Sequence, residues 1–164
     1  ETAKFDGPYT VMGAMEKIPL VFLDGPKDAT MNVVPVDYVI EGLARLSASS
    51  LSLGRTYNLT DPDGKDVRTF SRLMAKALGR SYIYVPLPLS LVRATVSIPF
   101  VQKTLGLIPE SIAYFGHRCR YDASQAKADL ATLGLACPAM ESYIDVIVAF
   151  FRANRDRVRK TAMV

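Results

Sequence analysis

The stretch from Met31 to Ala44, MNVVPVDYVIEGLA, constrains the fold of this chain more than any other. It begins with the short apolar run 31–34, which is typical of a buried strand. Pro35 cannot donate a hydrogen bond to a strand ladder, so we expect the strand to end there. Asp37 then offers a side-chain oxygen to the free amides of a new helix, and the helix would present one apolar face. That face would consist of Val39, Ile40, Leu43 and Ala44. This is one α/β unit, in which Pro35 and Asp37 have structural roles.

Similar units surround it along the chain. Strands are predicted at Leu20–Leu23, Thr56–Thr60 and Tyr82–Val85, and a short helix at Tyr9–Lys17. A second helix should start with Thr69 as its cap and end at Gly79. Its apolar face would be Phe70, Leu73, Met74, Ala77 and Leu78. The clearest helical periodicity is that of Met140, Tyr143, Ile144, Ile147, Val148 and Phe151. These spacings predict a single α/β domain over residues 1–164, with few short, mainly parallel strands and several helices.

The amino-acid composition changes after residue 85. The segment from Pro86 to Pro109 is apolar but is interrupted by prolines, Arg93 and Lys103, so we expect two or three short helices and no membrane span. This helical flap, residues 85–117, either packs on the core or forms a lid over an apolar substrate pocket. In the second case Leu91, Val92 and Phe100 are candidate substrate-binding residues.

Arg118 and Arg120 are the charged candidates. On a strand they would share one face, and their planar guanidinium groups suit phosphate or carboxylate. They are either ordinary surface arginines or an anion clamp at the mouth of a substrate site.

Composition excludes several classes of function. The net charge of +4 gives no argument for nucleic-acid binding. One histidine and two distant cysteines make no recognisable metal site, so no metal is expected. Cys119 and Cys137 form no CxxC motif, and there is no signal-peptide core, which favours a reduced, cytoplasmic protein.

Motifs of cofactor chemistry are missing from the chain. It has no GxGxxG or GxxGxxG turn to hold a dinucleotide, no YxxxK pair, no GxSxG elbow and no P-loop. We therefore assign no catalytic and no cofactor-binding residues, and expect neither activity nor tight cofactor binding from this segment alone. The missing initiator methionine suggests a piece of a longer protein.

Four segments occur in an order that resembles the later part of the extended short-chain dehydrogenases/reductases, the epimerase/dehydratase-like family. They are FDGPY at 5–9, NVVPVDYV at 32–39, GRTYNLTDPDG at 54–64 and YDASQAKADLATLGL at 121–135. The segment VVPVDYV is most similar to the corresponding segment of the thioester-reductase and fatty-acyl-reductase branch. The resemblance implies the C-terminal, substrate-binding part of a Rossmann-like enzyme, whose absent N-terminal part would bind NAD or NADP.

The resemblance leaves three functions open. The first is the substrate-binding segment of an NAD(P)-dependent oxidoreductase acting on an apolar acyl or thioester substrate. The second is the same segment of a nucleotide-sugar epimerase or dehydratase, because enzymes of that branch use basic residues near the positions of Arg118 and Arg120. The third is a non-catalytic ligand-binding or assembly module. A missing neighbouring part would also leave apolar surface uncovered, so we expect a homo-oligomer.

Overall fold

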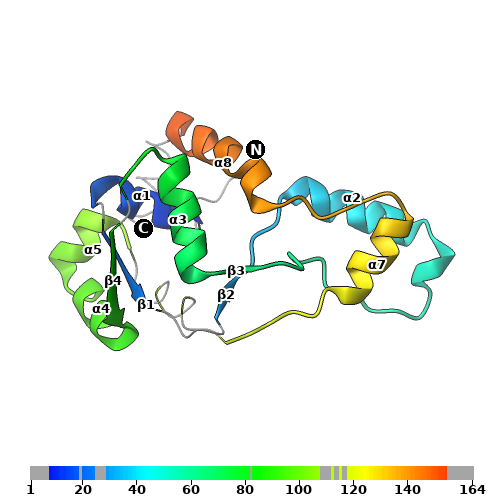
Figure 1. Cartoon of the computed structure of the whole chain (residues 1–164), viewed down its shortest axis with the longest axis horizontal. Coiled ribbons are helices and arrows are strands. Elements are labelled where there is room, and N and C mark those ends of the chain that lie inside the picture. The colour runs from blue at the N-terminus through cyan, green and yellow to red at the C-terminus, as the bar shows by residue number, and fades with distance from the viewer. Residues whose placement is uncertain are drawn as a thin grey trace.

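A computed structural model describes residues 8–18, 20–24, 29–81, 83–107, 112, 115 and 118–154 of this chain. For residues 20–24 and 86 it describes the backbone alone. The FDGPY motif up to residue 7, His117 and the basic residues from Arg155 onward lie outside this part. In the described part, two groups of helices are joined by extended segments (Figure 1). One group holds α1, α3, α4, α5 and α8, and the other holds α2 and α7.

Helices dominate the described residues. The α-helices are α1 (Pro8–Lys17), α2 (Val36–Ser47), α3 (Val67–Ala77), α4 (Leu89–Val96), α5 (Pro99–Leu105), α7 (Ser124–Thr132) and α8 (Met140–Ala153). A single 3-10 turn, η1, spans Ser50–Ser52. The strands are β1 (Leu20–Asp24), β2 (Thr30–Met31), β3 (Lys65–Asp66) and β4 (Ile83–Pro88). The two short helices expected between Pro86 and Pro109 are confirmed as α4 and α5.

The strands form two small sheets. β1 pairs with β4 in parallel, with Leu20 opposite Ile83, and β2 pairs with β3 antiparallel. Parallel strands need a long crossover, and here the crossover between β1 and β4 includes α2 and α3. The protein is therefore an α/β protein, as predicted, but each sheet has only two strands.

Two strand predictions were wrong in extent. Of the run 31–34, only Met31 lies in a strand, because β2 consists of Thr30 and Met31 and ends well before Pro35. Residues 56–60 form no strand, and their polar groups bond instead to the α7 region. Tyr57 Oη donates to Asp129 Oδ2 at 2.7 Å, and Asn58 Nδ2 donates to the carbonyl of Asp122 at 3.0 Å.

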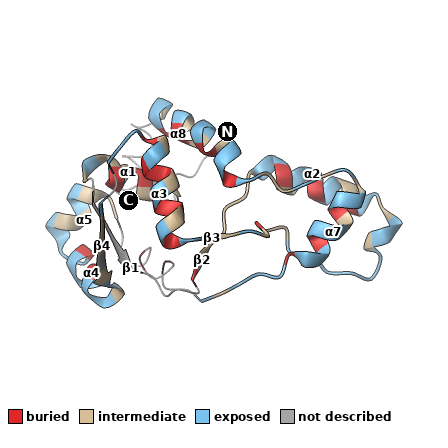
Figure 2. Ribbon diagram, in the orientation of Figure 1, coloured by how far each residue is buried: buried red, intermediate tan, exposed pale blue. Residues whose placement is uncertain are grey.

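The largest apolar core lies between α1, α3 and α8 (Figure 2). The predicted apolar faces of α3 and α8 both pack in this core, so the predicted periodicity of these two helices is confirmed. Its buried members are Met12, Met15, Phe70, Met74, Ala75, Leu78, Met140, Ile144, Val148 and Phe151. Tyr143 Oη donates to the carbonyl of Val33 at 2.7 Å, which ties this core to the segment that leads into α2.

The predicted apolar face of α2 was wrong except at Val39, which is partly buried against the cluster around Tyr38. The helix buries Tyr38, Gly42 and Leu46, whereas Ile40 is 61% exposed and Leu43 is 58% exposed. The buried side packs on α7 and the 57–59 segment, with Tyr38, Leu46 and Leu130 at the centre of a small cluster. A Cβ at Gly42 would lie 3.4 Å from a Leu59 methyl group, so the glycine lets this segment come close.

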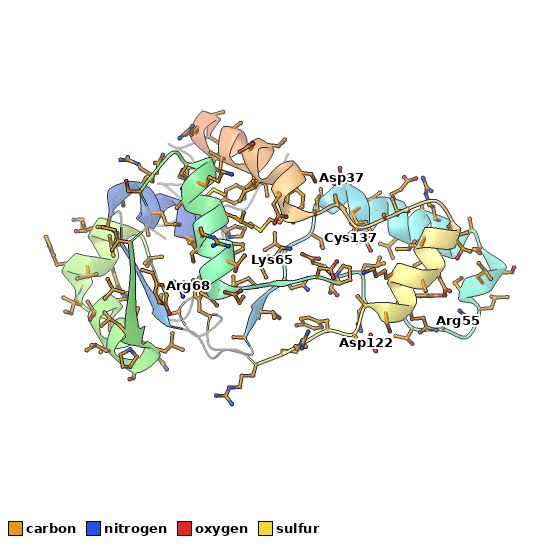
Figure 3. The ribbon with its side chains drawn as sticks, viewed as in Figure 1. Asp37, Arg55, Lys65, Arg68, Asp122 and Cys137 are labelled. Carbon is orange, nitrogen blue, oxygen red and sulfur yellow. The ribbon has the colours of Figure 1, made fainter. Side chains whose placement is uncertain are left out.

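Both predicted helix caps also need correction. The N-cap of α2 is Pro35, and Asp37 lies in the first turn, where its Oδ1 accepts from the amide of Tyr38 at 3.1 Å. The negative charge of Asp37 therefore interacts favourably with the dipole of α2, and Asp37 does not cap the helix. In α3 the cap is Asp66, whose Oδ1 accepts from the Thr69 amide at 2.9 Å, while Thr69 is the donor. Pro35 directly precedes α2, where the prediction placed the turn from the extended segment into the helix. Asp37, in the first turn of α2, is labelled in Figure 3.

Candidate functional site

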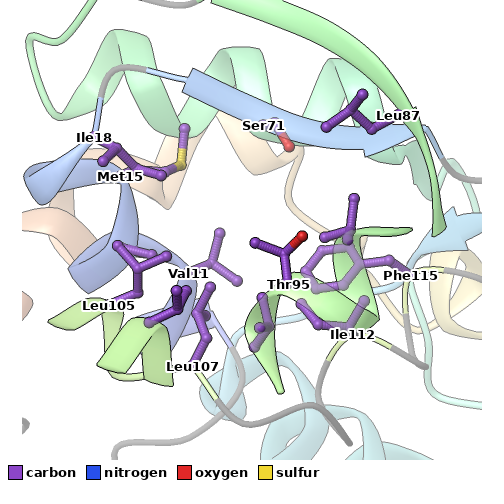
Figure 4. A pocket seen from close by; sticks show the side chains of 14 residues that line it. Val11, Met15, Ile18, Ser71, Leu87, Thr95, Leu105, Leu107, Ile112 and Phe115 are labelled. Atoms are coloured by element: carbon purple, nitrogen blue, oxygen red, sulfur yellow. The ribbon is translucent and has the colours of Figure 1, made fainter. Parts of the chain in front are cut away.

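An apolar cavity lies where the flap meets the helical core (Figure 4). It has a volume of about 180 Å³. Its walls come from α1, α3, β4, α4, α5 and the residues that follow α5. The lining residues are Val11, Ala14, Met15, Ile18, Ser71, Leu87, Val92, Thr95, Val96, Val101, Leu105, Leu107, Ile112 and Phe115. A cavity of about 150 Å³ holds benzene, so this one takes an apolar group of about six to seven carbons.

The sequence builds these walls by helical spacing. Val92 and Val96 lie one turn apart on α4, and Val101 and Leu105 lie one turn apart on α5. The flap side is held to α1 by a hydrogen bond from Lys17 Nζ to the carbonyl of Thr104. These contacts fix the two sides of the cavity relative to each other.

Thr95 marks the mouth of the cavity. Its residue surface is exposed although its side chain lines the cavity, so the space reaches solvent beside it. The Thr95 hydroxyl donates to the carbonyl of Leu91 at 2.9 Å, so its hydrogen is already used within α4. The cavity therefore reaches solvent beside Thr95 on α4.

Among the described lining residues, only Ser71 has a buried polar side-chain atom without a partner. It lies on α3, is 1% exposed, and its hydroxyl has no hydrogen-bond partner. Figure 4 shows the hydroxyl oxygen directed toward the enclosed space. Leaving a buried hydroxyl without a partner costs about 1–3 kcal/mol. Thr60 Oγ1 is the only other such side-chain atom in the described part of the chain, and Thr60 does not line this cavity.

The three flap candidates from the sequence take different places. Val92 is buried and lines the cavity. Leu91 is 51% exposed and Phe100 is 78% exposed, and neither lines it. α4 and α5 thus each present one side inward and the other to solvent. Sequence reasoning missed Ser71 and the α1 residues; the only signal was a serine within the apolar face of α3.

The two arginine candidates are not brought together on a strand. Residues 118–120 have no regular structure, and both side chains are exposed. Arg120 lines a second, open hollow at the start of α7 with Asp122 and Lys127, and Arg118 does not line it. The carboxylate of Asp122 accepts from the Ser124 amide at 2.9 Å, and hydrogen bonds from Ser124 lower its pKa. The hollow therefore combines two cations with an ionised acid.

The cysteine with a shifted pKa is poorly suited to nucleophilic chemistry. Burial, reinforced by the negative charges of Asp61 and Asp63, raises the pKa of the Cys137 thiol to about 11. The thiolate is the reactive form of cysteine, and at neutral pH almost none of it forms here.

The described residues lack two other classes of site. They hold no group of three or more histidine, cysteine, aspartate or glutamate side chains that could bind a metal ion. Within the same residues, no helix combines the length and apolar character needed to cross a membrane.

Comparison with known proteins gives no match, either to family models, to curated proteins or to solved structures.

Proposed function

We propose that this chain is the substrate-binding segment of an NAD(P)-dependent oxidoreductase of the extended short-chain dehydrogenase/reductase kind, acting on an apolar acyl or thioester substrate. The observation that carries the proposal is the cavity of about 180 Å³, whose described lining residues are apolar apart from Ser71 and Thr95. Burying a methylene group is worth about 0.8 kcal/mol, so an acyl chain gains from these walls whereas a sugar gains little. The Rossmann-like assignment rests on the ordered sequence motifs.

The remaining expectations form part of the same proposal. NAD or NADP would bind to a neighbouring dinucleotide-binding part, and this segment alone would neither bind it tightly nor catalyse the reaction. The protein would work in the cytoplasm as a homo-oligomer. The exposed side chains of Val36, Ile40 and Leu43 on one side of α2 support association with a second copy.

A nucleotide-sugar substrate is the second candidate. It is supported by Arg120 and Lys127 in the open hollow at α7, where a diphosphate would find two cations. The nearby carboxylate of Asp122 weakens this support, because its charge repels an anion.

The choice between these substrates can be tested by binding. The 164-residue chain is titrated with the N-acetylcysteamine thioester of hexanoic acid and, separately, with UDP-glucose, and amide NMR shifts are followed. We expect the thioester to shift amides of α1, α4 and α5. Thr95→Trp, which fills the mouth of the cavity, should weaken this binding at least tenfold.

The matched control is Ala94→Trp, since Ala94 is exposed on the same helix and does not line the cavity. It should bind the thioester like the wild type. Binding of UDP-glucose alone, lost in Arg120→Ala and unchanged in Thr95→Trp, would reverse the ranking.

A further inference from the structure

The cavity contains one polar atom that the fold itself leaves unused. Ser71 Oγ is buried, has no partner and faces the enclosed space, while the other described lining side chains are apolar or, as in Thr95, already donate within their own helix. A serine in the middle of a helix usually bonds to the carbonyl four residues earlier. Here that bond is not made, so the hydroxyl is free to donate into the cavity.

We propose that Ser71 is a ligand-binding residue that donates a hydrogen bond to an uncharged carbonyl oxygen of the bound molecule. This deepens the proposed function, and it rests on binding of the substrate in this cavity. It names the ligand class as an apolar body of about six to seven carbons that carries a neutral carbonyl group: a ketone, aldehyde, ester or thioester.

A free carboxylate does not fit this site. A buried charge needs a partner of opposite charge, and none of the described lining residues is charged. A plain hydrocarbon fills the space but leaves Ser71 Oγ without a partner. A neutral carbonyl compound satisfies both the walls and the hydroxyl.

Three probes with seven carbons each test whether the cavity prefers a neutral carbonyl compound to a hydrocarbon or a carboxylate: heptan-2-one, heptane and heptanoate. Their dissociation constants for the full chain are measured by titration at neutral pH. After allowance for the difference in their transfer free energies from water to an apolar solvent, we expect heptan-2-one to bind about fivefold to tenfold more tightly than heptane, the range of one hydrogen bond, and heptanoate to bind least tightly. This comparison needs no variant, so it holds even if a substitution disturbs folding.

The variant Ser71→Ala should weaken binding of the ketone about fivefold to tenfold and leave heptane binding unchanged. Ser90→Ala is the control, because Ser90 is exposed on α4 and does not line the cavity. With heptan-2-one labelled with ¹³C at its carbonyl, the resonance of the bound carbonyl should lie further downfield in the wild type and in Ser90→Ala than in Ser71→Ala.

The outcomes separate the two proposals. If heptan-2-one binds the wild type no more tightly than its transfer free energy predicts, or if Ser71→Ala binds the ketone as tightly as the wild type does, the role of Ser71 is wrong while the cavity remains a ligand site. Heptanoate binding as tightly as the ketone also overturns the role of Ser71. If none of the probes binds, both the role of Ser71 and the proposed substrate site fail.

Discussion

At the scale of single residues, the cap of α3 gives a direct test of the structure against the sequence pattern. Asp66 accepts hydrogen bonds from both the amide and the hydroxyl of Thr69. Asp66→Ala should lower the free energy of unfolding by about 1–2 kcal/mol, the loss of a good N-cap. Asp37→Ala, which removes a first-turn charge and the long hydrogen bond from the Tyr38 amide but no N-cap, should cost less, about 0.3–1 kcal/mol. Urea denaturation measures both; equal costs would contradict the assigned caps.

The cap of α3 also carries a pH dependence. Burial by itself raises the pKa of Asp66, but the hydrogen bonds from Thr69 and from backbone amides outweigh it, so the pKa lies below its ordinary value. A carboxylate with a lowered pKa stabilises the fold above its unfolded pKa of about 3.9, and this is lost as pH falls through the folded pKa. The difference between wild type and Asp66→Ala should therefore shrink below about pH 4.

Residue roles of this kind were only partly predictable from the sequence. Asp37 follows a proline and precedes an apolar run, so it has the pattern of a cap, yet the helix already begins at Val36. Ser71 has the pattern of an ordinary helical serine. Whether its hydroxyl finds a partner depends on the walls that α1, α4 and α5 bring around it, which local pattern does not encode.

At the scale of elements, α8 is one of the main supports of the core between α1, α3 and α8. Phe151 is 1% exposed and packs in the cluster of α1, α3 and α8. Phe151→Ala should cost about 3–5 kcal/mol through lost burial and the cavity left behind. Val146→Ala on the exposed side of the same helix should change stability by less than about 0.5 kcal/mol. Thermal unfolding of both variants tests this, and a small cost for Phe151→Ala would mean that α8 packs loosely.

The contrast between α8 and α2 explains why some elements were predictable. α8 has one continuous apolar stripe, so its buried face is unambiguous. α2 has two candidate stripes, the buried Tyr38–Gly42–Leu46 and the predicted Val39–Ile40–Leu43–Ala44, and the second is the more apolar. The first is buried because α7 and residues 57–59 cover it, and these contacts are distant in sequence. The 56–60 segment failed as a strand for a related reason: the described residues offer it no neighbouring strand to pair with.

At the scale of the whole molecule, the two groups of helices are supported very unequally (Figure 1). Of the described residues, ten buried ones form the cluster of α1, α3 and α8, and three form the cluster of α2 and α7. Tyr57 Oη and Arg55 Nη1 both bond to Asp129 Oδ2 at 2.7 Å and help hold the second group. These bonds are exposed or half-buried, and exposed ion pairs add about 0–1 kcal/mol.

We therefore expect the group of α2 and α7 to open at a lower free energy than the main core, because local opening follows the amount of buried apolar contact. In native-state hydrogen exchange, amides of α7 should exchange faster than those of α3 and α8. Leu130→Ala, which removes a fully buried side chain of the small cluster, should accelerate exchange in α2 and α7 and leave α3 and α8 unchanged. Thr132→Ala, at an exposed position of α7, should have little effect. Equal acceleration throughout the chain would instead mean that both groups unfold as one cooperative unit, and the cavity between α1, α3 and the flap would then depend on the distant contacts of α2 as well as on its own walls.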